Sequence, residues 1–149
     1  MAAVRTVTVT WQGPLATGDG TVTAGSSGMF TDLPISWGSR TERPDGRTSP
    51  EELLAAAHAA CFAMAFSADL GRAGYTPDEL HVEAEVSFDK LEAGWTVTSS
   101  ALTVLGHVQG ISPEEFDRIA EGTRDGCPIS RALAGNVALT VDATLETDG

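Results

Sequence analysis

The chain has 149 residues, of which 42% are hydrophobic and 20% are charged, and its formal net charge is -12. This length and balance predict a single soluble domain, residues 1–149, that is long enough to bury a core. The negative charge disfavours nucleic acid and anionic membrane surfaces as partners.

The first part of the chain predicts strands. Apolar and polar residues alternate over residues 6–11, 18–24 and 33–37, and a polar, turn-rich loop follows. The N-terminus enters the strand pattern directly, without the apolar block and cleavage site of a signal peptide. We therefore expect a cytoplasmic protein.

A long helix should follow that loop. Ser49 can cap it, Pro50 fits its first position, and it should end near Leu70. Between residues 53 and 66 only His58 is strongly polar, and this apolar stretch is too short for a membrane span. Because a helix that is apolar all round must be buried, we expect a second subunit to help cover it.

The remaining elements complete an α+β pattern. Residues 81–89 and 95–104 alternate like the strands of a hairpin. Helix-start signals predict helices over residues 112–126 and 128–134, and a last strand should cover residues 136–146. The predicted order is β-β-β-α-β-β-α-α-β.

Two cysteines are the candidate reactive groups. Cys61 lies in the apolar helix, where an inert core thiol is the ordinary interpretation. Cys127 directly precedes Pro128 at a helix N-terminus, which favours the thiolate. From the residues alone Cys127 is the more activated thiol, and nothing shows that the two meet. No metal-ligand spacing joins the cysteines to the three histidines, His58, His81 and His107.

Two segments resemble the OsmC/Ohr family of hydroperoxide reductases. They are TSPEELLAAAHAACFAMAFS, residues 48–67, and GCPISRAL, residues 126–133; HAACFAMA is more similar to the OsmC branch. The resemblance covers nearly the whole chain from Trp11 onward. It implies an intertwined homodimer in which sheets wrap two long central helices. It also implies reduction of organic hydroperoxides, and often hydrogen peroxide, in stress defence, without a metal, flavin or haem cofactor.

The resemblance also implies roles for individual residues. Cys61 would attack the peroxide, and Cys127 would then form a disulfide with it. An external dithiol, such as a lipoylated protein, would restore both thiols. The family's site glutamate corresponds to Glu51. Its arginine corresponds best to Arg40, and two other loop arginines remain candidates, Arg43 and Arg47.

Helix geometry adds one expectation about this site. Glu51 and Cys61 are ten residues apart on one helix, which is about 15 Å. One arginine does not easily reach both within a chain, so we expect Glu51, with Arg40 beside it, to come from the partner subunit. Apolar residues are expected to line the substrate pocket: Phe62, Met64, Phe66 and Ile129.

Other interpretations remain open. His58 lies three residues before Cys61, so it is either a general base or a histidine that satisfies a hydrogen bond in the core. The cysteine pair could instead serve a redox sensor with negligible turnover. A third interpretation is a non-catalytic, dimeric binding protein with inert thiols.

Overall fold

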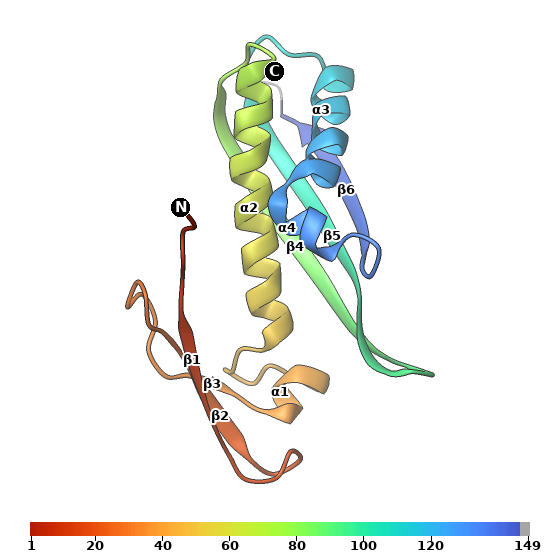
Figure 1. The fold of residues 1–149 in the computed structure, drawn as a ribbon. Coiled ribbons are helices and arrows are strands. Elements are labelled where there is room, and N and C mark those ends of the chain that lie inside the picture. The colour runs from red at the N-terminus through yellow and green to blue at the C-terminus, as the bar shows by residue number, and fades with distance from the viewer. Residues whose placement is uncertain (147–149) are drawn as a thin grey trace. The chain divides into compact units, whose positions relative to one another are not determined.

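A computed structural model describes residues 1–146. The chain forms two compact units, Met1–Leu53 and a second that begins at Leu54, and Figure 1 shows its helices and strands. The α+β class and the predicted order of strands and long helices are confirmed, with one additional short helix. The elements are β1 (Val7–Gln12), β2 (Asp19–Ala24), β3 (Leu33–Ile35), α1 (Trp37–Thr41), α2 (Pro50–Arg72), β4 (Pro77–Leu91), β5 (Gly94–Val108), α3 (Pro113–Gly126), α4 (Pro128–Leu133) and β6 (Ala138–Leu145).

The first unit holds an antiparallel sheet of order β1-β2-β3. The prediction of a strand over residues 33–37 was wrong at its end, because helix α1 begins at Trp37. Ser36 Oγ accepts the Ser39 N–H at 3.0 Å, and Ser39 Oγ accepts the Ser36 N–H at 3.0 Å. This reciprocal capping box satisfies two backbone donors and starts a helix at a point where the alternation still suggested a strand.

Helix α2 begins as predicted. The Glu52 N–H donates to Ser49 Oγ at 3.1 Å, which confirms Ser49 as the cap. The carboxylate of Glu52 accepts from the Thr48 hydroxyl at 2.7 Å, so Glu52 adds a second contact to the first turn of the helix.

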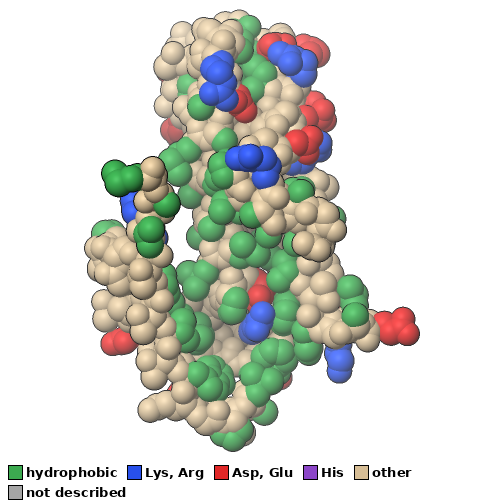
Figure 2. All heavy atoms as spheres, viewed as in Figure 1, with side chains coloured by type: hydrophobic (Ala, Val, Ile, Leu, Met, Phe, Trp, Pro, Cys, Tyr) green, Lys and Arg blue, Asp and Glu red, His purple; other side chains and the backbone are tan. Residues whose placement is uncertain are grey.

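Only one face of α2 is buried in the single chain. Its fully buried residues recur every four positions, as His58, Phe62, Phe66 and Leu70, whereas Met64 is 70% exposed. Hydrophobic side chains therefore lie exposed along the face over α2 in Figure 2. The expected complete enclosure of this helix is not provided by its own chain.

The length of α2 also corrects an expectation. The apolar segment judged too short for a membrane ended at residue 66, but the helix runs to Arg72 and is long and apolar enough to span one. The core helix of a soluble protein meets the same criteria, and the buried face of α2 forms the core of its unit. The helix therefore does not indicate a membrane protein.

The second unit is built on a sheet of order β4-β5-β6. Strands β4 and β5 form an antiparallel hairpin, and β6 pairs with β5 in parallel, with α3 and α4 in the connection between them. Both hairpin strands have 15 residues and are longer than predicted. Buried positions alternate along β5 from Ser100 to Val108, so one face of this strand looks into the core.

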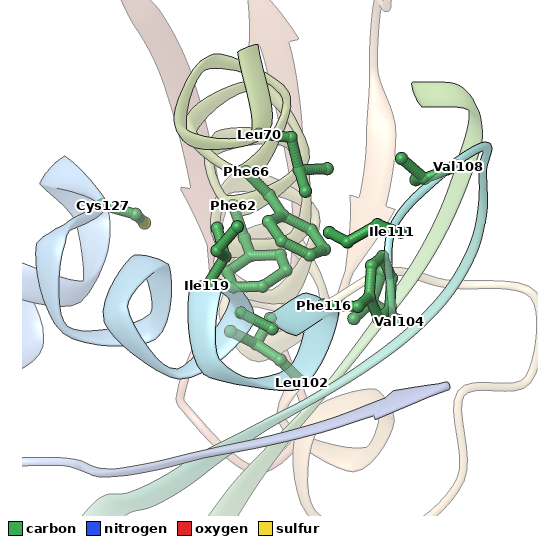
Figure 3. Packing of buried hydrophobic residues seen from close by; sticks show 11 residues of the cluster. Phe62, Phe66, Leu70, Leu102, Val104, Val108, Ile111, Phe116, Ile119 and Cys127 are labelled. Carbon is green, nitrogen blue, oxygen red and sulfur yellow. The ribbon is translucent and has the colours of Figure 1, made fainter. Parts of the chain in front are cut away.

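Aromatic rings of α2 and α3 form the centre of this core. The ring centroids of Phe62 and Phe66 are 5.4 Å apart, and those of Phe66 and Phe116 are 5.1 Å apart. Figure 3 shows these side chains pointing toward one another beside Leu102. Gly106 of β5 lies against the same cluster. A Cβ atom there would be 2.6 Å from Phe116 Cζ, so any larger residue would force the Phe116 ring to shift.

Candidate active site

The two cysteines meet in the second unit. Cys61 is held on α2, and Cys127 lies where α3 ends and α4 begins. Their Sγ atoms are 3.4 Å apart, and both cysteines are free thiols. A disulfide needs about 2.05 Å between the sulfurs, so a small movement would join them. Residues that the sequence separates widely therefore form one dithiol centre.

The backbone fixes Cys127 from both sides. Its N–H donates to the Thr123 carbonyl at 2.9 Å, and its carbonyl accepts the Arg131 N–H at 2.9 Å. The Ser130 N–H donates to Cys127 Sγ at 3.4 Å. Burial raises the pKa of Cys127, but interactions with the Ser130 side chain and N–H, the Cys61 thiol and the Ile129 N–H together outweigh it, so the pKa lies below its ordinary value. This thiol is thus the readier of the two to ionise in the isolated chain.

Cys61 has the opposite properties. It is partly exposed, whereas Cys127 is 1% exposed. Burial raises the pKa of Cys61, a hydrogen bond from the Ile129 N–H opposes this, and the adjacent Cys127 sulfur adds to the increase. The more accessible sulfur is therefore the one that its own chain activates less.

A buried histidine lies beside the dithiol. His58 Nδ1 is 2.6 Å from Ser100 Oγ of β5, and His58 Nε2 is 2.8 Å from Ser130 Oγ of α4. All three side chains are 0% exposed. Burial lowers the pKa of His58, so the imidazole is neutral near pH 7. These contacts agree with the hydrogen-bonded core histidine that was one of the two interpretations.

The first unit contains the predicted arginine and glutamate. Arg40 Nε donates to Glu51 Oε1 at 2.8 Å, and Arg40 Nη2 donates to Glu51 Oε2 at 3.0 Å. The Glu51 side chain is 10% exposed and that of Arg40 31%. Trp37 lies next to the guanidinium, with its ring centroid 5.9 Å from Arg40 Cζ. A bidentate pair of this kind fixes the direction of the guanidinium.

Arg40 is thus the arginine that pairs with Glu51. The two alternatives, Arg43 and Arg47, lie instead in the loop between α1 and α2, around a separate surface pocket. Arg40 also borders a mostly apolar pocket of about 280 Å³, which is lined by Trp11, Leu15, Ile35, Ser36, Trp37, Arg40 and Pro50.

The residues expected to line a substrate pocket have varied positions. Phe62 and Phe66 are fully buried in the core of the second unit. Met64 is exposed on α2, and Ile129 is partly buried against the core. A substrate-lining role for these four residues stays a prediction.

Sequence reasoning missed both partners of His58. Ser100 occupies a core-facing position of β5, in line with Leu102 and Val104. A hydroxyl at such a position, like a lone histidine on an apolar helix, needs a buried partner, and this shared need was the available signal. Within residues 1–146 no group of three or more histidine, cysteine or acidic side chains could hold a metal ion.

Comparisons with known proteins identify the family. The family model described as "OsmC-like protein" matches residues 43–142. "Peroxiredoxin OsmC" of Escherichia coli (strain K12) is 43% identical over 129 residues, which are 87% of this chain and 89% of that protein. The chain belongs to the OsmC-like protein family.

More distant relatives carry Ohr names. "Organic hydroperoxide resistance protein OhrA" of Bacillus subtilis (strain 168) is 29% identical over 126 residues, 83% of this chain and 86% of that protein. The crystal structure of OhrB of Bacillus subtilis matches with a TM-score of 0.67 at 26% identity, covering 95% of this chain and 98% of that one. The predicted family and its OsmC branch are confirmed, and the chain is an oxidoreductase of the peroxidase class.

Proposed function

We propose that the protein reduces organic hydroperoxides, and hydrogen peroxide, with Cys61 as the attacking thiol and Cys127 as the resolving thiol. The observation that carries this proposal is the 3.4 Å separation of the two sulfurs, since it allows a disulfide to form with little rearrangement. The partial exposure of Cys61 supports its role, because peroxide from solvent reaches that sulfur first. The names of the relatives support the substrate class.

The reaction balances with two thiols and one peroxide. The Cys61 thiolate attacks one peroxide oxygen, the O–O bond breaks, and the leaving alkoxide takes a proton and departs as an alcohol. Cys61 is now a sulfenic acid. The Cys127 thiolate attacks its sulfur, the S–O bond breaks, and hydroxide leaves and is protonated to water. A dithiol, which we expect on a lipoylated protein, then reduces the disulfide by exchange and supplies both returning protons.

The raised pKa of Cys61 requires a positive charge beside this sulfur during attack. The Arg40–Glu51 pair is the natural source, since a guanidinium keeps its charge and Glu51 directs it. We propose that a second copy of the chain contributes this pair and that the protein is a homodimer. The exposed apolar residues on α2 and the exposed strand β1 favour such a partner.

Subunit mixing tests the shared site. Neither a Cys61→Ser dimer nor an Arg40→Met dimer should reduce peroxide at the wild-type rate. A mixed dimer of the two variants contains one site with both residues intact if the pair comes from the partner subunit. Activity restored in purified mixed dimers supports the proposal. If mixing restores no activity, or if diluted monomers are fully active, the shared site is wrong.

Peroxide consumption with dihydrolipoamide tests the chemistry itself. Cys61→Ser should abolish reaction with peroxide. Cys127→Ser should permit the first oxidation, detected as a trapped sulfenic acid, but prevent the disulfide and slow recycling. Wild-type protein that oxidises once without sustained turnover would indicate a redox sensor. Unchanged peroxide handling by Cys61→Ser, with no disulfide in the wild type, would indicate a non-catalytic binding protein.

We further propose that the whole chain acts as a single domain and works in the cytoplasm. The chain covers most of the length of relatives such as the Escherichia coli protein. A reducing compartment would also supply the dithiol on which the cycle depends. Fractionation of the producing cells, with immunodetection of the chain, would test this location.

A further inference from the structure

A polar contact joins α2 to the last turn of α3. The Thr123 hydroxyl donates to Asp69 Oδ2 at 2.6 Å, and the Thr123 side chain is 0% exposed. Asp69 belongs to the second half of α2, which lies beside α3 in Figure 1. Thr123 is the polar member of the buried face of α3, which consists of Phe116, Ile119, Ala120 and Thr123.

Neither partner needs this contact to satisfy its hydrogen-bonding groups. The Thr123 hydroxyl is also 2.9 Å from the Ile119 carbonyl, an ordinary acceptor for a threonine within its own helix. Asp69 pairs with Arg72 on its own helix, and its side chain is 30% exposed, so water can solvate it. The hydroxyl has one proton, and the charged carboxylate, at the shorter distance, is the stronger acceptor. The contact therefore adds a bond between two helices.

Thr123 is also bonded to Cys127. The Cys127 N–H donates to the Thr123 carbonyl at 2.9 Å, at the point where α3 ends. Thr123 thus binds Asp69 with its side chain and the cysteine with its backbone. Asp69 lies on the same helix as Cys61, eight residues and about 12 Å farther along it. The sulfur pair and the Asp69–Thr123 bond are therefore two points at which α2 contacts the end of α3.

The aromatic contact between these helices lies farther from Cys127. The ring centroids of Phe66 and Phe116 are 5.1 Å apart, and Phe116 belongs to the first turn of α3. Phe116 precedes Cys127 by eleven residues, about 16 Å of helix, whereas Thr123 precedes it by four, about 6 Å. Loss of the polar bond should therefore leave the start of α3 packed and loosen its last turn.

We propose that Asp69 and Thr123 are positioning residues, which hold the end of α3 against α2 and thereby keep Cys127 beside Cys61. A fixed position raises the effective concentration of one thiol at the other and favours the disulfide over the two thiols. The sulfurs, 3.4 Å apart, need only a small approach to about 2.05 Å, so the Asp69–Thr123 bond persists in the disulfide. The consequence for catalysis, faster attack of Cys127 on the Cys61 sulfenic acid with loss of water, rests on the function proposed above.

Equilibrium with glutathione measures this effective concentration without peroxide. One glutathione disulfide oxidises the two protein thiols to the protein disulfide and is itself reduced to two glutathione thiols. Thr123→Val keeps the shape of the side chain but lacks the hydroxyl, and Asp69→Ala lacks the acceptor. Each should lower the equilibrium constant about threefold to tenfold, less than the full value of a hydrogen bond to a charged group, because the rest of α3 stays packed. A tenfold fall makes the reduction potential about 30 mV less negative.

Two further variants show whether the bond itself is responsible. The double variant of Asp69→Ala and Thr123→Val should have an equilibrium constant close to that of the more affected single variant, because both changes remove the same bond. Thr123→Ser keeps the hydroxyl and should restore the wild-type constant. A side chain that only fills space would produce neither result.

Two matched controls leave the bond in place. Ile119→Val shortens a neighbour on the same buried face, and Arg72→Gln removes the other partner of Asp69. Both should keep the wild-type constant. Circular dichroism identifies the folded variants, and Asp69→Ala alone decides the question if Thr123→Val fails to fold.

Three results would overturn the proposal: a wild-type constant in folded Asp69→Ala, an equal fall in either control, or additive falls in the double variant. Thr123→Ser with the constant of Thr123→Val would overturn it as well. Since no peroxide is used, a failed peroxidase assay leaves the glutathione result intact, and the two failures are distinguishable.

Discussion

Substitution of Phe66 separates its two suggested roles, core residue and substrate contact. The ring is 0% exposed and touches two other rings, with centroids 5.4 and 5.1 Å away. Truncation of a buried phenylalanine to alanine costs about 3–5 kcal/mol of unfolding free energy. Leucine keeps most of the apolar volume but loses both ring pairs, each worth about 0.5–1.5 kcal/mol. We therefore expect a loss of about 1–3 kcal/mol for Phe66→Leu.

Urea unfolding measures these losses, with Ser67→Ala as control on the adjacent, exposed position of α2. The control should change the unfolding free energy by less than about 0.5 kcal/mol. A core role also predicts that folded Phe66→Leu keeps the wild-type preference between a small and a bulky hydroperoxide. Wild-type stability in Phe66→Leu would refute the packing argument. A changed preference at unchanged stability would instead support the predicted substrate pocket.

Three further predictions concern other parts of the molecule. In Gly106→Ala the added Cβ would lie 2.6 Å from the Phe116 ring, so urea unfolding should show a loss of about 1–3 kcal/mol. Phe116→Leu removes that ring and should relieve part of this loss in the double variant. Burial lowers the pKa of His58 below its ordinary 6.5, so the unfolded chain takes up a proton that the folded chain resists. The contribution of His58 to stability is complete above about pH 6.5 and falls as the pH drops below it. Urea unfolding at several pH values from 7 to 5 should therefore show that the unfolding free energy of His58→Gln depends less on pH than that of the wild type. An equal pH dependence in the two proteins would contradict this reasoning. Arg40→Lys keeps the positive charge but loses the bidentate contact with Glu51. Cys61 oxidation in stopped-flow assays should therefore slow about tenfold or more at pH 7 and recover at higher pH. A wild-type oxidation rate at pH 7 would contradict this prediction.

Much of the fold follows from local sequence signals. The cap at Ser49 and the helix starts before Pro113 and Pro128 rest on contacts within a few residues, and the structure contains all three helices. Helix α1 was missed because its capping box uses two serines in a sequence that alternates like a strand. Strands β4 and β5 were predicted too short, because long-range pairing extends a hairpin beyond the segment with the clearest alternation.

The candidate site depends more on distant contacts. Local chemistry indicated an activated Cys127, and the lowered pKa agrees with it. The meeting of Cys61 with Cys127 came only from the family resemblance, because no spacing rule joins two residues so far apart. His58 is paired with residues 42 and 72 positions away, and such partners are decided by the packing of α2 on β5 and α4.

The four-residue spacing of the buried side chains along α2 limits how this helix can change in length. His58, Phe62, Phe66 and Leu70 share one face, and Cys61 is one position before the first ring. One residue inserted between His58 and Cys61 would turn everything after it by about 100° and move it by about 1.5 Å. Either the imidazole would leave its serines or the rings would leave the core. Variation within this helix must therefore proceed by substitution, whereas the exposed loop before it can gain or lose residues.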